Sequence, residues 1–203
     1  MGNRLLLELL KGLTEPERGG RPAFTLYHVH ALLKELKKEP LGRPSISYRL
    51  GLSDSSVKTL LARLKERGLI MRSRGGAVLT EKGEELLKWL NSKVRVCETS
   101  LGFKSWEQAV AIAVSCVNPP VKDVEAMAFR DLFIAAGCSK AIVGSWARDR
   151  FLMPGSPPEL ESEIGGKVSK CFTEGDLMFV AIVNNRELDK AYNALVSVFE
   201  LCL

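Results

Sequence analysis

The sequence predicts a chain of two domains that belong to different fold classes. We expect an N-terminal winged helix-turn-helix over residues 25–93 and a C-terminal α+β domain over residues 109–203. The first observation is that residues 43–81 carry two helical patterns and a hairpin pattern in that order. The second is charge: up to residue 93 there are 18 Lys and Arg against 10 Asp and Glu, a net of +8, and beyond it 11 against 14, a net of −3. The basic domain therefore carries the helix-turn-helix pattern, which favours a polyanionic partner.

Three further segments complete the predicted organisation. Residues 1–24 hold a short amphipathic pattern and a polar connector with Gly and Pro, and we interpret them as an N-terminal extension. Residues 94–108 are interpreted as a linker between the domains. Residues 25–38 repeat apolar side chains at helical spacing, which predicts the first helix of the N-terminal domain.

The next two predicted helices form the helix-turn-helix itself. Ile46 and Leu50 are four residues apart on a short helix, and Gly51 follows where a tight turn needs positive φ. Ser53 or Asp54 can cap the second helix. That helix repeats apolar residues at i, i+3, i+4 and i+7, namely Val57, Leu60, Leu61 and Leu64. One face of this helix is therefore expected to be buried.

The opposite face of the second helix is the expected recognition surface. At about 100° per residue, the side chains that point away from the apolar stripe are Ser55, Thr59, Ala62, Arg63 and Glu66, with Ser56 and Lys58 at its edges. Small side chains allow close approach to a DNA groove, and the hydroxyl and cationic groups can bond to bases or phosphates.

A hairpin follows the second helix. Two alternating segments flank Gly75 and Gly76, a turn signal, and Arg72 and Arg74 lie beside this turn as a basic wing. We therefore predict that double-stranded DNA is contacted by seven residues: Ser55, Ser56, Lys58, Thr59, Arg63, Arg72 and Arg74. The alternative interpretation is a solvated basic face, and the combination of helix, turn and wing on the basic half favours DNA.

The C-terminal domain is predicted to follow the order β-α-β-β-β-α, with one mixed or antiparallel sheet covered by two helices. The first predicted strand is the apolar run that begins at residue 109 and stops at Asn118-Pro119-Pro120. The inward residues of the first helix are expected to be Val124, Met127, Ala128, Leu132 and Ala135, and those of the last helix Leu188, Ala191, Tyr192, Leu195 and Phe199. Residues 154–166 are interpreted as a surface excursion.

Catalytic, metal and cofactor sites are not indicated. His28 and His30 lie two residues apart, so on a helix they diverge by about 160° and cannot share one metal ion. No nucleophile with a matching base and no phosphate-binding glycine motif is present, so we expect no enzyme and no cofactor. The five cysteines are odd in number and widely spaced, which predicts buried thiols rather than disulfides or a zinc site.

The predicted location is the cytoplasm. No apolar run reaches the roughly 20 residues that a membrane-spanning helix needs. The N-terminal residues are not typical of a signal peptide, because their apolar part is short and soon followed by charges.

A small-molecule site in the C-terminal domain is a second hypothesis. Asn118 follows one predicted strand and precedes a helix, and Asn184 and Asn185 follow another. If the two strands run in the same direction, their ends share one edge of the sheet and the three amides can line a pocket. The alternatives are that Asn118 caps a helix and that the domain is a dimerisation scaffold.

The arrangement resembles a family of archaeal two-domain proteins in which a winged helix precedes an α+β domain of unknown function. The resemblance rests on EPLGRPSISYRLGL, SSVKTLLARL and LTEKGEE in the first domain, and on AIAVSCVNPP, RDLFIAAG and DLMFVAIV in the second. It covers residues 25–200. The resemblance implies a transcription regulator and supplies no ligand or catalytic residues.

The function predicted from these observations is a DNA-binding transcriptional regulator whose C-terminal domain dimerises, senses a small-molecule effector, or both. We expect a homodimer, because a single winged helix reads few base pairs, with Trp89 and Phe199 on the contacting helices. The alternative is an interaction module whose winged helix binds a protein of the transcription machinery. RNA binding is a third possibility.

Overall fold

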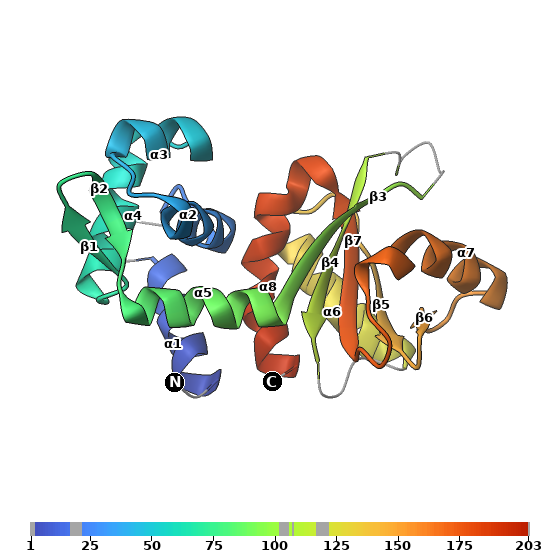
Figure 1. Ribbon diagram of the computed structural model, residues 1–203. Helices are drawn as coiled ribbons and strands as arrows, with labels where there is room; N and C mark the ends of the chain where they lie inside the picture. Colours follow the sequence, from blue (N-terminus) through green and yellow to red (C-terminus); the bar gives the residue numbers. More distant parts are fainter. Residues whose placement is uncertain (1–2, 17–21, 102–105, 107, 117–121, 203) are drawn as a thin grey trace. The chain divides into compact units, whose positions relative to one another are not determined.

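The computed structural model of the chain describes residues 3–16, 22–101, 106, 108–116 and 122–202 (Figure 1). The chain divides into two compact units, Met1–Asn91 (unit 1) and Ser92–Leu203 (unit 2). The described residues form eight α-helices and two antiparallel sheets, so the protein is of the α+β class. None of these helices is long and apolar enough to cross a membrane.

Unit 1 consists of helices and one hairpin (Figure 1). Its elements are α1 (Asn3–Thr14), α2 (Leu26–Lys38), α3 (Arg43–Leu50), α4 (Asp54–Glu66), β1 (Ile70–Ser73), β2 (Gly76–Leu79) and α5 (Glu81–Lys93), whose last residues pass into unit 2. Local sequence explains the helix ends. Gly51 ends α3 with a φ of 65°, and the Ser53 hydroxyl caps α4 by accepting from the Ser56 amide at 3.2 Å.

Helix α1 belongs to unit 1, which corrects the interpretation of residues 1–24 as an extension. Its buried side chains are Leu6, Leu7, Leu10 and Leu13. These leucines recur at helical spacing on one face, and α1 packs against α2. Helix α1 is therefore part of the core of unit 1.

The hairpin is joined to the segment that precedes α3. β1 and β2 pair in antiparallel register, with Ser73 opposite Gly76, so Arg74 and Gly75 form its two-residue turn. Leu41 and Ala77 exchange backbone hydrogen bonds of 3.1 and 2.8 Å. Gly76 has a φ of 129°, and a Cβ on it would lie 2.3 Å from the Leu41 carbonyl oxygen. A glycine is thus required for this close approach.

Unit 2 is built on a five-stranded antiparallel sheet in the order β3-β4-β7-β5-β6. The strands are β3 (Val94–Thr99), β4 (Ala109–Ser115), β5 (Ile142–Ala147), β6 (Arg150–Leu152) and β7 (Met178–Asn184). The helices are α6 (Asp123–Ala135), α7 (Pro158–Val168) and α8 (Leu188–Cys202), with the 3-10 turns η1 (Ser169–Cys171) and η2 (Asn185–Glu187).

This architecture differs from the predicted one in two elements. Residues 94–99 form the edge strand β3 rather than part of a linker, since Val94 to Thr99 pair with Val114 to Ala109 along their whole length. Residues 158–168 form a helix rather than a surface excursion, and its Ile164 and Val168 are buried. Within the described residues, three helices rather than two therefore cover this sheet, and the hairpin of unit 1 forms a second sheet.

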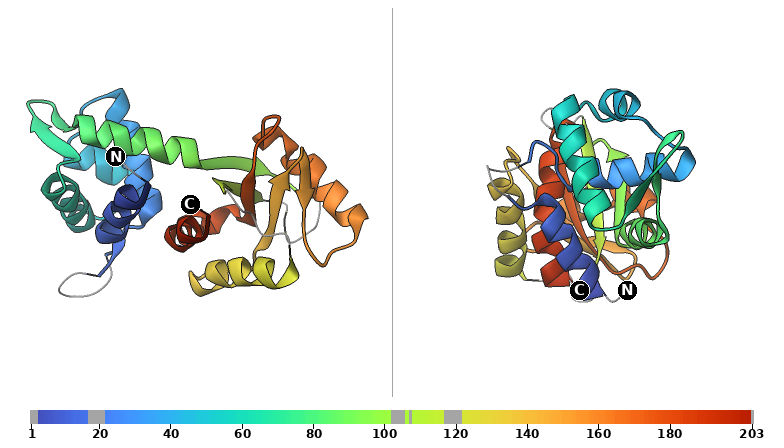
Figure 2. Two further views of the ribbon diagram at one scale, coloured as in Figure 1. Left: turned by 90° about the horizontal axis from the view of Figure 1, so that it is seen from below. Right: turned by 90° about the vertical axis from the view of Figure 1, so that its left-hand side faces the viewer.

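Both faces of the sheet are covered (Figure 1 and Figure 2). On one face, Phe129 and Phe133 of α6 stack on Phe179 of β7, and α8 packs against β4 and β7. On the other face, α7 and Trp146 form a core with the alternate residues of β4 and β7. The all-buried strands β4 and β7 lie at the centre because they have neighbours on both faces and both edges.

Helix α6 buries a different face from the predicted one. Ala126, Phe129 and Phe133 point inward. Four of the residues predicted to be inward are instead exposed, namely Val124, Met127, Ala128 and Ala135. The helix has apolar residues on two faces, and the phenylalanines determine which is buried because they remove the most apolar area from water. In α8 the prediction is confirmed for Ala191, Tyr192, Leu195 and Phe199.

Four of the five cysteines form disulfides, so the prediction of buried thiols is wrong for them. Cys97 of β3 is bonded to Cys171 of η1, and Cys116 after β4 is bonded to Cys202 of α8. The partners lie 74 and 86 residues apart in sequence, and the sheet brings their Cα atoms to 5.8 and 4.3 Å. Cys138 is a free, buried thiol. Sequence spacing alone cannot reveal pairs that the tertiary fold creates.

Candidate nucleic-acid interface

Helix α4 carries five of the seven residues predicted to contact DNA. Of its predicted apolar stripe, Val57, Leu60 and Leu64 are buried, whereas Leu61 is half-buried. Ser55, Lys58 and Thr59 are exposed and Ser56 is half-buried. The predicted geometry of the helix is therefore present, and its polar face divides into a covered flank and an open flank.

Arg63 lies on the covered flank and is not available to DNA. Its side chain is 5% exposed, and its Nη1 donates hydrogen bonds of 2.8 Å to the carbonyl oxygens of Leu13 and Glu15. The guanidinium also lies 5.6 Å from the centre of the Phe24 ring. Arg67, one turn later, donates to the carbonyl oxygen of Gly12. The prediction of Arg63 as a DNA contact is wrong, because the last carbonyls of α1 need donors and Arg63 supplies them.

The first turns of the same flank adjoin the segment before α2. Pro22, Ala23 and Phe24, together with Ser55, Ser56 and Thr59, line a small hollow of about 130 Å³. The hydroxyls also bond locally, since Thr59 donates to the Ser55 carbonyl at 3.0 Å. These three polar residues thus sit at the rim of α4, next to residues 22–24.

The open flank of α4 forms one wall of a groove of about 590 Å³. Lys58, Leu61, Ala62 and Lys65 line it from α4. The other walls come from the hairpin and from the start of α3, and their lining residues are Leu41, Gly42, Arg43, Ile70, Met71, Arg72, Gly76 and Ala77. The groove therefore has an apolar floor between basic side chains.

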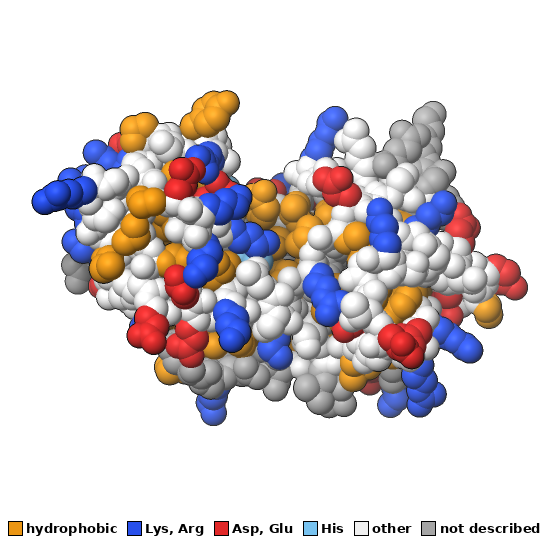
Figure 3. Space-filling view, viewed as in Figure 1, with side chains coloured by type: hydrophobic (Ala, Val, Ile, Leu, Met, Phe, Trp, Pro, Cys, Tyr) orange, Lys and Arg blue, Asp and Glu red, His pale blue; other side chains and the backbone are white. Residues whose placement is uncertain are grey.

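The cations of this groove are not neutralised. Lys58, Lys65 and Arg72 are exposed, and so is Arg74 in the hairpin turn. Within the part of the chain that the structure describes, none of these four side chains has an ion pair or a side-chain hydrogen bond. Arg43 has one weak partner, Asp54, at 3.6 Å. In Figure 3, Lys and Arg side chains gather at the edge of unit 1 where Figure 1 draws the hairpin.

A second group of cations in unit 1 is largely neutralised. It lines a different hollow, with Lys34, Lys37, Lys38 and Arg49. Lys37 pairs with Glu84 at 2.7 Å, Lys38 with Glu35 at 2.5 Å, and Arg49 with both Glu35 and Glu39. Hydrogen bonds from Lys38 and Arg49 lower the pKa of Glu35, so that carboxylate stays charged. The groove beside α4 therefore has the stronger unbalanced positive charge of the two.

Comparisons with known proteins match both an N-terminal segment and most of the chain. Residues 28–85 match the model of the PH0730-like N-terminal domain family. The solved structure of the hypothetical protein PH0730 from Pyrococcus horikoshii OT3 is 30% identical, with a TM-score of 0.60, and the match covers 88% of this chain and 92% of that one. The chain belongs to the PH0730-like family. No curated protein matches it.

The PH0730-like match has two consequences for the site. It confirms the resemblance to an archaeal two-domain protein, since the neighbour is archaeal and the match extends over most of both chains. The family segment, residues 28–85, contains every residue that lines the groove. Helix α1, whose Leu13 carbonyl oxygen accepts a hydrogen bond from Arg63, lies outside that segment.

The structure contradicts the strand direction on which the predicted small-molecule site depends. Asn118 lies outside the described residues. β4 and β7 are antiparallel, with Ala109 opposite Asn184 and Ser115 opposite Met178, so the last residues of the two strands lie at opposite ends of the sheet. Asn184 caps η2 by accepting from the Arg186 amide at 2.9 Å. The hypothesis assumed that the two strands run in the same direction, and the antiparallel register contradicts that assumption.

A hollow does exist elsewhere in unit 2, between β6 and α7. It measures about 570 Å³, and Trp146, Arg150 and Ser162 are among its lining residues. No group of three potential metal ligands occurs among the residues that the structure places.

Both histidines have structural contacts. His28 Nδ1 accepts from the Thr25 amide at 3.1 Å, at the start of α2. His30 is buried, and its Nε2 lies 2.9 Å from Asn91 Oδ1. Burial lowers the pKa of His30 to about 4, against a smaller opposing effect of the Asn91 hydrogen bond. His30 is therefore a neutral core residue at pH 7.

Proposed function

We propose that unit 1 binds double-stranded DNA as a winged helix-turn-helix and that the protein is a transcriptional regulator. The observation that supports this most is the set of four unneutralised cations, Lys58, Lys65, Arg72 and Arg74, on the open flank of α4 and on the hairpin. DNA carries one phosphate charge per about 1.7 Å of helix axis, and unpaired surface cations are the groups that neutralise it.

The proposed docking places α4 in the major groove. Lys58, Ala62 and Lys65 follow one another at i, i+4 and i+7, so they line one face of the helix. Ala62 between two lysines lets the helix backbone approach the base edges. The hairpin, with Arg72 on β1 and Arg74 in its turn, then reaches the flanking phosphates or the minor groove.

The residues of α4 that we propose to contact DNA differ from those predicted from the sequence. Arg63 is replaced by Lys65, because Arg63 holds the end of α1. Ser55, Ser56 and Thr59 remain candidates for contacts at the start of α4, where the backbone N–H groups favour a phosphate.

A salt series with a charge-matched control tests DNA binding. Removal of Lys58, Lys65, Arg72 and Arg74 by alanine substitution should weaken binding to a duplex and flatten the dependence of affinity on salt, by about 0.9 in slope for each phosphate that is no longer neutralised. The control removes the same number of charges at Lys34, Lys37, Lys38 and Lys88. Equal slopes for the two variants would contradict the proposal.

One observation favours the alternative that the winged helix binds a protein. The groove beside α4 has an apolar floor that includes Leu61 and Met71, and Met71 is 56% exposed. If a protein partner occupies this floor, Met71→Asp abolishes that complex, and duplex DNA binds equally weakly to the chain with and without the four cations. A duplex RNA competitor in the same titration separates RNA from DNA binding.

We further propose that the regulator acts as a homodimer through α6. The surfaces expected from the sequence cannot form the dimer interface, because Trp89 and Phe199 are buried, at 8% and 0% exposed. Helix α6 instead exposes Val124, Met127 and Ile134 at 79%, 51% and 43%. Arg130 and Asp131 pair with each other at 3.2 Å in the middle part of this helix, so a two-fold axis there places this ion pair beside that of the other copy.

A further inference from the structure

The two disulfides of unit 2 differ in their access to solvent. Cys116 and Cys202 are each 2% exposed. Cys97 and Cys171 are both only partly buried. Thiol–disulfide exchange requires a thiolate to reach a sulfur atom, so the Cys97–Cys171 bond is the accessible one of the two.

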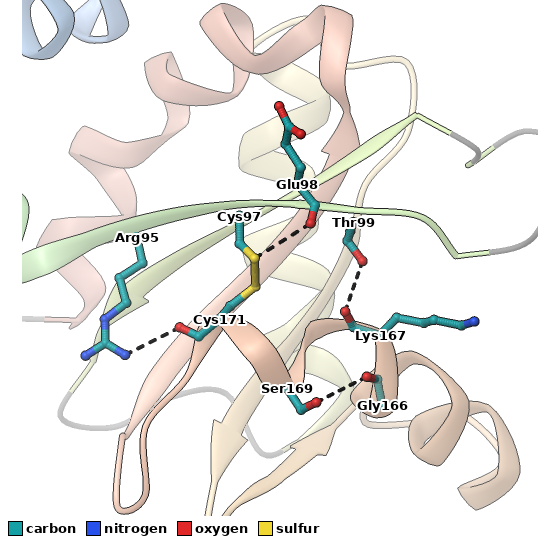
Figure 4. The surroundings of a disulfide bond; sticks show 8 residues. All are labelled: Arg95, Cys97, Glu98, Thr99, Gly166, Lys167, Ser169 and Cys171. Carbon is teal, nitrogen blue, oxygen red and sulfur yellow. Dashed lines mark hydrogen bonds between the residues drawn. A yellow bond between two sulfur atoms is a disulfide. The ribbon is translucent and has the colours of Figure 1, made fainter.

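The position of Cys97 explains this access. β3 is an edge strand of the sheet, so strand β4 borders it on one side only. Cys171 belongs to the three-residue turn η1 rather than to a helix or strand of the core. Figure 4 shows the disulfide bridging the edge strand and this turn.

Two cationic residues adjoin the backbone of Cys171. Arg95 Nη1 approaches the Cys171 carbonyl oxygen at 3.5 Å (Figure 4), and the exposed Lys170 precedes Cys171 in the chain. Nearby cations favour the thiolate form of a cysteine, and a more stable thiolate is a better leaving group. Arg95 is itself paired with Asp176, so its charge favours this thiolate only in part.

Cys97 has an acceptor ready for the reduced state. Its Sγ lies 3.7 Å from the carbonyl oxygen of Glu98 (Figure 4). A disulfide sulfur has no hydrogen to donate, so this contact becomes a hydrogen bond only when Cys97 is a thiol. Reduction thus leaves Cys97 as a hydrogen-bonded thiol.

We propose that Cys97 and Cys171 form a reversible exchange site for low-molecular-weight thiols. A thiolate attacks one sulfur, a mixed disulfide forms and the other cysteine leaves as a thiolate, which takes up a proton. A second thiol then attacks the mixed disulfide and releases the first cysteine. In total, two electrons and two protons pass from two small thiols to Cys97 and Cys171, and the small thiols become a disulfide.

Other contacts keep the two cysteines close after reduction. Arg95 forms a two-pronged ion pair with Asp176, and Thr99 donates to the Lys167 carbonyl at 3.2 Å. These contacts join β3 to both ends of the η1 region, so the bond can form again. The released segment is short: it contains η1 and Phe172, whose ring stacks on Trp146 at a centroid distance of 4.4 Å.

The test uses the folded full-length chain. It is incubated with increasing dithiothreitol without denaturant, free thiols are trapped with iodoacetamide, and the labelled peptides are measured by mass spectrometry. We expect Cys97 and Cys171 to be labelled at least roughly ten times faster than Cys116 and Cys202. Cys138 serves as an internal control, because burial raises the pKa of its thiol to about 11 and keeps it unreactive.

Two outcomes of the labelling would overturn the proposal: simultaneous labelling of all four disulfide cysteines, or labelling of Cys116 and Cys202 first. A second measurement follows amide hydrogen exchange of residues 158–172 with and without dithiothreitol. The reductant should accelerate exchange there in wild type and in C116S/C202S, and have no effect in C97S/C171S. An equal effect in C97S/C171S would show that the response comes from elsewhere. Neither experiment depends on DNA binding.

Discussion

The guanidinium of Arg63, on α4, donates a hydrogen bond of 2.8 Å to the carbonyl oxygen of Leu13 near the end of α1. A second bond of the same length goes to the Glu15 carbonyl oxygen. The last carbonyls of a helix have no partner within the helix, and a cation at that end also offsets the helix dipole. Arg63 therefore joins α1 to the helix that we propose to read DNA.

Arg63→Ala should lower the stability of unit 1. The substitution removes two hydrogen bonds from a charged donor and the contact with Phe24, so we expect a loss of about 2 to 4 kcal/mol in the free energy of unfolding. Urea unfolding followed by circular dichroism measures it. Arg74→Ala is the matched control, since Arg74 is exposed and should leave stability within about 0.5 kcal/mol. Equal stability of the two variants would show that Arg63 has no structural role.

Helical periodicity predicted much of the candidate site. The spacing of Val57, Leu60 and Leu64 gives the buried face of α4, so the exposure of Lys58 on the other side follows from local sequence. The exposure of Arg72 and Arg74 follows in the same way from the hairpin pattern. The exposure of these three side chains could be predicted because it depends on residues within one or two turns or strands of the chain.

Arg63, Cys97 and β3 could not be predicted in this way. The partners of Arg63 lie 48 and 50 residues away, and that of Cys97 lies 74 residues away. The alternation of charged and apolar residues in 94–99 is compatible with several structures until β4 provides a partner strand. The prediction of the buried face of α6 was wrong for a related reason. Both faces of this helix carry apolar residues, and only packing against the sheet determines that the phenylalanines are buried.

His30 predicts a loss of stability in acid. Its pKa is about 4 in the folded chain and about 6.5 when unfolded, so the unfolded state binds the proton more tightly. The stabilisation is complete above pH 6.5 and is lost as pH falls from 6.5 to 4, with an upper limit of about 3 kcal/mol. The free energy of unfolding of wild type should therefore fall more steeply over this range than that of His30→Gln. Parallel pH profiles would exclude His30 as the cause.

Met127→Asp should dissociate the proposed homodimer. A carboxylate at this exposed position of α6 would have to be desolvated in the interface, opposite an apolar surface of the other copy. Sedimentation equilibrium at tens of micromolar measures the change in mass. Leu177→Asp is the control, because Leu177 is also exposed, at 41%, but lies outside α6. A monomeric wild type, or equal masses for both variants, would rule out α6 as the interface.

Lys58 and Arg74 should differ in what they contribute to DNA binding. Lys58 lies on α4, which we place against base edges, so Lys58→Ala should weaken the preferred duplex by about 1 to 3 kcal/mol and a random duplex by less. Arg74 lies in the turn of the hairpin, where we expect a phosphate contact, so Arg74→Ala should weaken both duplexes equally and reduce the salt slope by about 0.9. Lys37→Ala is the control, since Lys37 is already paired with Glu84 at 2.7 Å and should leave both affinity and slope unchanged. Fluorescence anisotropy on a labelled duplex, repeated at several salt concentrations, gives both quantities. If the affinities of Arg74→Ala and Lys37→Ala depend on salt with the same slope, the hairpin does not contact DNA. The apolar floor of the groove then becomes the better indication of the partner that unit 1 binds.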